Sequence, residues 1–287
     1  MYDCSKEFNK FYRTSVVLPE NEQNELREKR KLNVKRLKEG LLEYNEENKK
    51  DYKISEDRIQ GSMAMHTIVQ NDKGDYDIDV GIVFESSNLN GLGPLASRNM
   101  VADALKRKTK QFAEEPEVKT SCVRLNYIST GYHVDFALFK RDKDTEDDKE
   151  YTYEHAGFEW SVRDVKALEE WFNAQIREKG DILRKVIRLS KMFCKSRDTW
   201  KNMPSGLLHT VLCDEKLSTD YSRIDEVFYY TMQAIVNRIS DSTEVAAPVD
   251  DGRALVVRDI DRQRTVASYR GYPTNRTRRS AAIARRA

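Results

Sequence analysis

No stretch of the chain approaches the roughly 18 consecutive apolar residues that a membrane span needs, so the sequence predicts a soluble protein. The first residues, MYDCSKEF, lack the pattern of a secretory signal. The chain has only 4 cysteines and no CxxC pair, which argues against a zinc ribbon and against a disulfide framework. We therefore expect a cytoplasmic protein.

A strong charge of either sign is also missing, because 50 Lys and Arg residues nearly balance 48 Asp and Glu residues. Any phosphate-binding surface must therefore be local. The 287 residues are enough for two lobes that share a cleft. The last 36 residues carry ten arginines among Ala, Thr and Ser, and no lysine follows Lys216, so we expect a poorly packed tail there.

Residues 19–53 are predicted to form one long amphipathic helix, because apolar residues recur mostly three, four or seven positions apart. These are Leu26, Val34, Leu37, Leu41 and Leu42. The runs YDIDVGIVF, VRLNYI and YHVDFALF alternate with period two and predict strands of one sheet. A helix that begins at a Ser97 cap and stops at Pro116 is expected between them, and a charged loop at 141–150.

After Trp160 the pattern becomes helical. Helices are expected at 161–180, with Ser161 as its cap and Gly180 as its end, and from Asp181 to about residue 197. Two more are expected at 204–215 and 221–240. The helix after Asp181 carries a basic stripe whose members are spaced four, three and four apart: Arg184, Arg188, Lys191 and Lys195.

Acidic residues interrupt two of the predicted strands. Asp77 and Asp79 lie two apart and therefore point to the same face of their strand, and Asp135 likewise interrupts the apolar run YHVDFALF. Three carboxylates buried together are unfavourable without a cation, and oxygen ligands favour Mg²⁺ or Mn²⁺. The sequence thus predicts a site for two such ions. The competing interpretation is that Asp77 and Asp79 are a strand-edge pair facing solvent and that the Asx residues near Gly74 and Asp75 only form a turn.

A short polar segment, Gln60-Gly61-Ser62, precedes the acidic strand. Glycine lets the backbone approach a phosphate, the Ser62 hydroxyl can donate to one, and the segment MAMHTIV that follows could form a helix whose N-terminus favours an anion. Gly-Ser, helix, Asp-x-Asp strand and a later single-Asp strand form an ordered set that is more specific than any one member. The four histidines have no metal-ligand spacing among themselves.

The segments QGSMAMHT, GDYDIDVGIVF and GYHVDFALF together resemble the polymerase-β-type nucleotidyltransferase superfamily, and within it the bacterial CD-NTases, relatives of cyclic GMP-AMP synthase. The resemblance implies an α+β, two-lobed fold with a mixed sheet, an N-terminal spine helix and a helical C-terminal lobe. We therefore expect a nucleotidyltransferase core with the spine helix at 1–160 and a helical lobe at 161–251, followed by the arginine-rich tail at 252–287, which does not resemble the family's final helix.

The same resemblance implies roles for named residues. Gly61 and Ser62, with Gln60, would hold the donor triphosphate, and Asp77, Asp79 and Asp135 would bind two metal ions, Asp135 also helping to deprotonate the acceptor hydroxyl. In the related synthases a lysine and a serine of the helical lobe touch nucleotide phosphates, and the corresponding positions here resemble Lys191 and Ser205.

The expected activity is template-independent synthesis of a cyclic di- or trinucleotide from NTPs such as ATP, GTP or pyrimidine NTPs, with release of pyrophosphate. In the family such products switch on an effector protein during phage infection. A zinc insertion is absent, so double-stranded DNA is not expected as an activator. Alternatives are a linear oligonucleotide synthase, a transferase of AMP onto RNA or protein, and a catalytically silent nucleotide-binding regulator.

Overall fold

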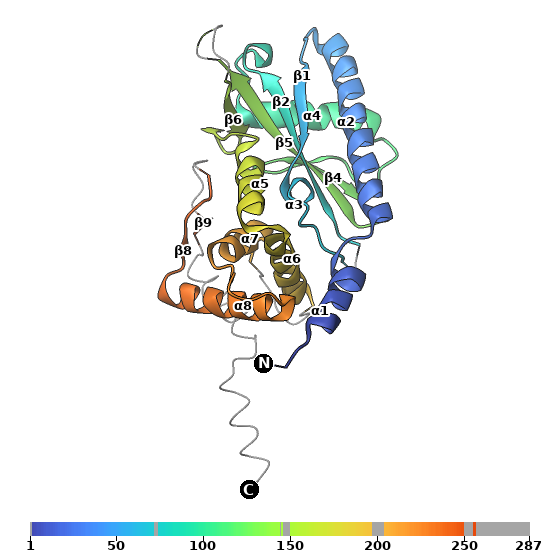
Figure 1. Cartoon of the computed structure of the whole chain (residues 1–287). Helices are drawn as coiled ribbons and strands as arrows, with labels where there is room; N and C mark the ends of the chain where they lie inside the picture. Colours follow the sequence, from blue (N-terminus) through green and yellow to red (C-terminus); the bar gives the residue numbers. More distant parts are fainter. Residues whose placement is uncertain are drawn as a thin grey trace. The chain divides into compact units, whose positions relative to one another are not determined.

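The computed structural model describes residues 2–71, 74–143, 145, 150–196, 204–249 and 255–256 (Figure 1). Its internal contacts divide the chain into two compact units. One is built around a sheet and consists mainly of residues 18–173; the other is helical and contains residues 2–17 and 174–248. Residues 161–173 therefore pack with the sheet, and residues 2–17 pack with the helices, unlike the division expected at residue 160.

The sheet of the first unit is mixed. Its strands follow the order β1-β2-β5-β4-β3, and β6 pairs with β5 and with β7. Only β2 and β5 run parallel among the pairings of the described residues; the remaining pairs of this sheet are antiparallel. The strands span Ile54–Ile59 (β1), Asp77–Glu85 (β2), Glu117–Val118 (β3), Val123–Tyr127 (β4), Tyr132–Asp142 (β5), Thr152–Ala156 (β6) and Trp160–Val162 (β7).

One face of this sheet holds the main core. Even-numbered residues of β2 and β5 point to it, so their fully buried side chains form one apolar layer: Ile78, Val80, Ile82, Phe84, Val134, Phe136 and Leu138. Odd-numbered residues therefore point to the opposite face. Asp77, Asp79 and Asp135 are among them, and this alternation is what keeps three carboxylates out of the core.

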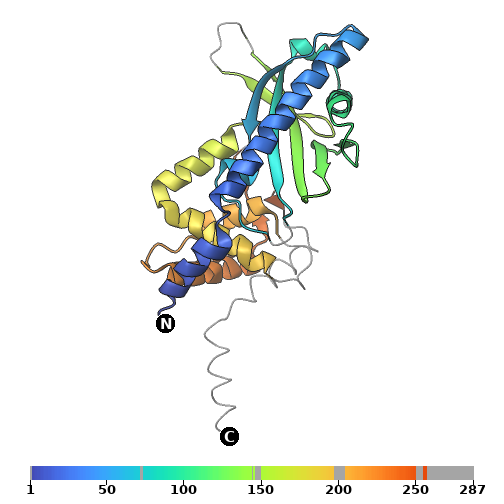
Figure 2. The same cartoon turned by 90° about the vertical axis from the view of Figure 1, so that its right-hand side faces the viewer.

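Two helices cover the apolar face, α2 (Glu20–Asn48) and α4 (Pro94–Lys108). Figure 2 shows α2, in blue, running along the sheet. The helices approach so closely that a Cβ at Gly40 of α2 would overlap the backbone carbonyl oxygen of Ala104 in α4. Only glycine leaves room for that crossing.

The long helix predicted at 19–53 is present over Glu20–Asn48, and four of its five predicted apolar positions are buried. Leu42 is the exception, with 65% exposure, because it follows Leu41 by one residue and so lies about 100° around the helix from it. The predicted Ser97 cap is wrong. Pro94 begins α4 three residues earlier, and Ser97 lies inside the helix, where its hydroxyl donates to the carbonyl of Gly93.

Two further predictions need correction. Ser161 does not cap a helix; it lies in β7, and the helix that follows, α5, spans Ala167–Lys179. The segment MAMHTIV is not a helix either, because the single turn α3 occupies Gly61–Ala64 and His66 then takes a left-handed φ of 51°. Strand β1 was not predicted, since its sequence ISEDRI shows no apolar alternation.

The helical unit contains α1 (Ser5–Phe11), the π-helical turn η1 (Tyr12–Val16), α6 (Asp181–Lys195), α7 (Gly206–Glu215) and α8 (Ile224–Asp241). The last three match the predicted helices, and Gly180, with φ 77°, separates α5 from α6 as predicted. A short pairing of β8 (Glu244–Val245) with β9 (Leu255–Val256) completes the unit. Apart from that pairing, the predicted tail at 252–287 lies outside the described residues, as do residues 144 and 146–149 of the loop predicted at 141–150, whose first two residues belong to β5.

No helix in the described part of the chain combines the length and the apolar character that crossing a bilayer requires.

Candidate functional site

The three predicted carboxylates lie on adjacent strands. Asp79 of β2 and Asp135 of β5 are direct partners in the parallel pairing, and Asp77 pairs with His133 two residues earlier. Because Asp77, Asp79 and Asp135 all point to the face opposite the main core, their side chains share one side of the sheet. Asp77 is 58% exposed, whereas Asp135 is 15% exposed.

Gly61 borders this group from the turn after β1. Its φ of 61° is a left-handed conformation that favours glycine. A Cβ at this position would overlap Oδ2 of Asp79, so the Cα of Gly61 lies directly against that carboxylate. The structure thus brings the predicted Gly-Ser segment to the acidic strand.

Gln60 connects the same two segments through its backbone. Its N–H donates to the carbonyl oxygen of Asp79 at 3.0 Å, which continues the β1–β2 pairing by one residue. Its side-chain amide donates to the carbonyl of Val165 at 3.3 Å. Ser62 follows in α3, half-buried, and its carbonyl accepts from Thr67. The side chain of Gln60 therefore has a structural partner, and its nucleotide contact stays a prediction.

An arginine that the sequence analysis did not single out lies among the carboxylates. Arg124 of β4 is the antiparallel partner of Asp135. Its Nε donates to Oδ1 of Asp135 and its Nη2 to Oδ2, each at 2.7 Å, and Nη2 also lies 3.2 Å from Oδ1 of Asp77. The hydrogen bond to Asp135 is the leading cause of the raised pKa of Arg124. Arg124, Asp135 and Asp79 thus form one row across three strands.

Two neighbours complete the surroundings. Nδ1 of His133 lies 3.1 Å from Oδ1 of Asp75 and 3.5 Å from Oδ1 of Asp77. Burial, followed by the charge of Asp135, raises the pKa of the Cys122 thiol to about 12, so this group stays protonated at neutral pH.

The alternation of the strand could have identified Arg124 from sequence, because its side chain points away from the face of Val123 and Leu125 and hence toward the face of Asp135.

The donor set suits a hard divalent cation, since carboxylate oxygens are the ligands that Mg²⁺ and Mn²⁺ prefer. Asp77 and Asp135 both contact the guanidinium of Arg124, which indicates that a positive charge stabilises these carboxylates. Within the described ranges, however, no three acidic, histidine or cysteine side chains stand in a ready ligand arrangement. Metal binding by Asp77, Asp79 and Asp135 therefore stays a prediction.

Lys191 and Ser205 lie together in the helical unit. Lys191 of α6 is 9% exposed, and its Nζ lies 3.6 Å from the position that a Cβ of Gly206 would take. Ser205 caps α7: its hydroxyl accepts from the N–H of Leu208 at 3.2 Å. Ser205 thus has a structural role as a helix cap, and a lysine amine lies beside the start of that helix.

Behind this pair, α6 and α7 are joined by a buried hydrogen bond between Ser190 Oγ and His209 Nδ1, 2.8 Å long. Burial first, and then the charge of Lys191, lower the pKa of His209 to about 3, so its imidazole is neutral at pH 7. The basic stripe predicted on α6 is partly engaged elsewhere: Arg184 pairs with Asp181, and Arg188 donates to the hydroxyl of Tyr12.

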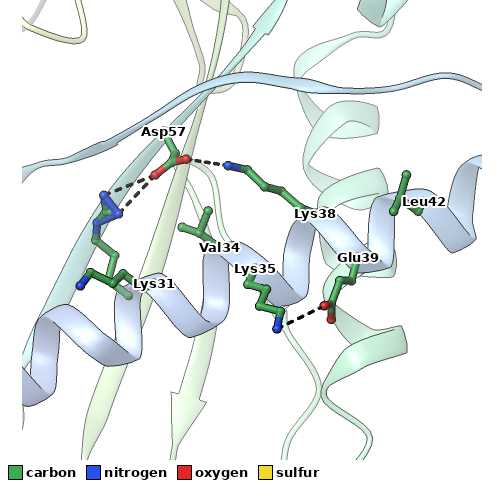
Figure 3. Close-up of a pocket in the computed structure, with 8 residues that line it drawn as sticks. Lys31, Val34, Lys35, Lys38, Glu39, Leu42 and Asp57 are labelled. Carbon is green, nitrogen blue, oxygen red and sulfur yellow. Dashed lines mark hydrogen bonds and ion pairs between the residues drawn. The ribbon is translucent and has the colours of Figure 1, made fainter.

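Two surface hollows lie in the sheet unit, and neither is lined by a predicted site residue. One, of about 310 Å³, lies between α2 and β1 (Figure 3). There Asp57 forms ion pairs with Arg30 and with Lys38, and Glu39 forms one with Lys35. The other, of about 370 Å³, is lined by residues of α2, β1 and α3 and by Glu169 of α5. In the first hollow most charges are already paired.

Residues 55–139 match the family described as "Cyclic GMP-AMP synthase DncV-like, nucleotidyltransferase domain". This segment includes α3, β2 and most of β1 and β5, and therefore Gly61 and all three carboxylates. This match agrees with the resemblance predicted from the sequence.

Solved structures extend the likeness to the fold of nearly the whole chain. The Vibrio cholerae di-nucleotide cyclase DncV, in a mutant form with ATP, GTP and 5MTHFGLU2, has 18% identity and a TM-score of 0.76 over 92% of this chain and 87% of its own. V. cholerae DncV with the linear intermediate 5′ pppA(3′,5′)pG has 17% identity and a TM-score of 0.75 over 92% and 86%. Escherichia coli CdnC with ATP has 15% identity and a TM-score of 0.66 over 93% and 89%. The predicted two-lobed polymerase-β-type nucleotidyltransferase fold is confirmed.

Proposed function

We propose that this protein is a template-independent nucleotidyltransferase that joins NTPs into a cyclic di- or trinucleotide and releases pyrophosphate. In this reaction a ribose hydroxyl of one nucleotide attacks the α-phosphate of another. The linear product then turns over in the same site and closes.

The observation that carries the proposal is the shared face of Asp77, Asp79 and Asp135 with Gly61 against Asp79. These residues lie within the segment that matches a nucleotidyltransferase family. The neighbouring folds were solved with ATP, with GTP and with a linear intermediate, and this supports NTPs as substrates here. A solvent-facing turn pair would not explain why a glycine with left-handed φ packs on one carboxylate.

Each residue has a distinct role in this proposal. The three carboxylates would hold divalent ions, which supply charge stabilisation for the attacking hydroxyl and the leaving pyrophosphate. The backbone at Gly61 and the hydroxyl of Ser62 bind the donor triphosphate and orient it for attack. Asp135 accepts the proton of the acceptor hydroxyl. Lys191 and Ser205, which lie together, bind phosphate oxygens.

The test is an incubation of the full chain with each labelled NTP and with their mixture, in Mg²⁺ or Mn²⁺, read by pyrophosphate release and mass spectrometry. Wild-type protein is expected to release pyrophosphate, and Asp79→Asn and Asp135→Asn are expected to abolish release while keeping the wild-type circular dichroism. Asp51→Asn is the matched control, because Asp51 is an exposed residue outside any helix or strand and the substitution changes charge and size equally. Wild-type rates in either site variant would refute the proposed chemistry.

Phosphatase treatment distinguishes the candidate products. A cyclic nucleotide has no terminal phosphate and resists the enzyme, whereas a linear oligonucleotide loses its terminal phosphates. Label that stays on added RNA or protein would instead identify an AMP transferase. Absence of pyrophosphate release under all these conditions would leave a silent nucleotide-binding regulator as the better account.

The resemblance to CD-NTases also suggests a cellular role. We propose that the protein acts in the bacterial cytoplasm, without a double-stranded DNA activator, and that its product acts on a separate effector protein during phage infection. Plaque counts on bacteria that carry the chain with its neighbouring genes are expected to fall, and Asp79→Asn is expected to restore them. Equal protection by the variant would exclude a role for the product.

A further inference from the structure

Arg124 forms a short ion pair with Asp135 and a longer contact with Asp77. Two of its nitrogens contact the two oxygens of Asp135 at 2.7 Å, a bidentate geometry that fixes both side chains. The contact from Nη2 to Asp77 is longer, 3.2 Å. A single guanidinium thus joins carboxylates from β2 and β5.

The exposed fractions of these side chains follow the same order as the contact distances, since the carboxylate with the shorter contact is the more buried one. The side chains of Asp135 and Arg124 are 15% and 22% exposed, while that of Asp77 is 58% exposed. The pair with Asp135 is therefore screened less by water than the contact with Asp77. Carboxylates that share a site repel one another, and a cation among them removes that cost.

We propose that Arg124 is the counter-cation of the carboxylates before divalent ions bind, and that bound ions displace it from Asp77 while its bidentate pair with Asp135 persists. This inference rests on the proposed function, which assigns the ions to these carboxylates. Arg124 is then a positioning residue. It holds Asp135 in place in both states, and it competes with the ions for Asp77.

The chemistry of the carboxylate permits both contacts at Asp135. Each carboxylate oxygen offers more than one lone-pair direction, so Asp135 can accept from Arg124 and still present oxygen to an ion. Ligating carboxylates are commonly hydrogen-bonded by such neighbours. At Asp77, by contrast, ion binding breaks only the long contact with Arg124, which water already screens. Competition for Asp77 lowers the affinity for the first ion.

The experiment measures Mn²⁺ binding to the full chain without nucleotide, by titration of the free-Mn²⁺ electron paramagnetic resonance signal. Arg124→Gln is expected to bind Mn²⁺ about three- to fivefold more tightly than wild type, the size of effect typical of one partly exposed charge pair. In EDTA the melting temperature of Arg124→Gln is expected to be lower than that of wild type. Addition of Mn²⁺ is expected to raise the melting temperature of the variant by more degrees than that of wild type.

Two further variants separate the causes. Arg141→Gln is the matched control, because Arg141 lies on the same sheet and pairs with Glu56 and Glu85 but with none of the site carboxylates. Its Mn²⁺ affinity is expected to equal that of wild type. Arg124→Lys keeps the charge without the bidentate fork, and is expected to bind Mn²⁺ with an affinity nearer to wild type than to Arg124→Gln.

The outcomes distinguish this inference from the proposed function. Wild-type protein that releases pyrophosphate, together with an Arg124→Gln variant that binds Mn²⁺ no more tightly than wild type, would overturn the role of Arg124 alone. Equal tightening in Arg141→Gln would overturn it as well, since general charge would then explain the effect. Absence of both Mn²⁺ binding and pyrophosphate release in wild type would refute the proposed function and this inference with it.

Discussion

The Cα of Gly61 lies against the carboxylate of Asp79, so closely that any side chain at position 61 would overlap Oδ2 of that aspartate. The left-handed φ of 61° adds a second restriction on the same residue. The backbone conformation at Gly61, where α3 begins, and the position of the Asp79 carboxylate therefore depend on each other. A substitution at Gly61 must move the turn, the aspartate or both.

Gly61→Ala is expected to reduce pyrophosphate release by about 100-fold, because displacing a catalytic group by even 1 Å has effects of that order. Gly91→Ala is the matched control: Gly91 has a left-handed φ of 77°, but a Cβ there meets nothing within 4 Å. Both variants are expected to lose about 1 kcal/mol of unfolding free energy through backbone strain. Urea denaturation and rate measurements give the two readouts, and equal activity of the two variants would contradict the assigned contact.

Gly40→Ala is expected to destabilise the sheet unit by about 1–3 kcal/mol, the usual range for overpacking, because the new methyl group meets the carbonyl of Ala104. Alanine is intrinsically the better helix former, so a gain in stability would show that α2 and α4 can separate at no cost. Lys35→Ala in the same helix is the control. Lys35 is 72% exposed, and its loss is expected to change the unfolding free energy by less than about 0.5 kcal/mol.

Ser205→Ala is expected to cost about 1 kcal/mol of unfolding free energy, since it removes the hydrogen bond that caps α7. Ser205→Asn can cap equally well and is expected to restore stability. If the hydroxyl also binds phosphate, as proposed, both variants raise the KM for NTPs. Full activity in the stable Ser205→Asn variant would limit Ser205 to its structural role.

His209 is expected to make the helical unit sensitive to acid. Its pKa is about 3 in the folded chain, below the ordinary 6.5, because burial disfavours the charged imidazole. The folded state then binds fewer protons than the unfolded state between these values, so the unfolding free energy falls as pH falls below about 6.5. The slope contributed by one such group reaches at most about 1.4 kcal/mol per pH unit.

The measurement is urea denaturation from pH 7 to pH 4.5 for wild type and His209→Gln. The variant is expected to have the flatter profile, although its stability at pH 7 is lower because the fit to Ser190 changes. His66→Asn is the control, because His66 is exposed. Parallel profiles for wild type and His209→Gln would mean that the imidazole is not kept neutral by the fold.

The elements that local patterning controls were predictable. Helix α2, the strands β2 and β5 and the helices α6 to α8 all have apolar residues at one period over many positions. Element ends were less accurate, as at Ser97 and Ser161, because a serine can cap a helix or lie within an element, and only its neighbours in space decide. Strand β1 was missed because its sequence, ISEDRI, has no apolar alternation, and its pairing with β2 in the folded chain is what makes it a strand.

The sequence by itself determined on which face of the strands the predicted site residues lie. Period-two alternation places Asp77, Asp79 and Asp135 on the face away from the core, whatever the strand order, because apolar residues occupy the positions between them. Only the tertiary structure decided that β2 and β5 pair in parallel with Asp79 opposite Asp135, that Gly61 lies on Asp79, and that Arg124 joins Asp77 to Asp135. Register and strand order arise from pairing between segments far apart in the chain, and no local pattern encodes them.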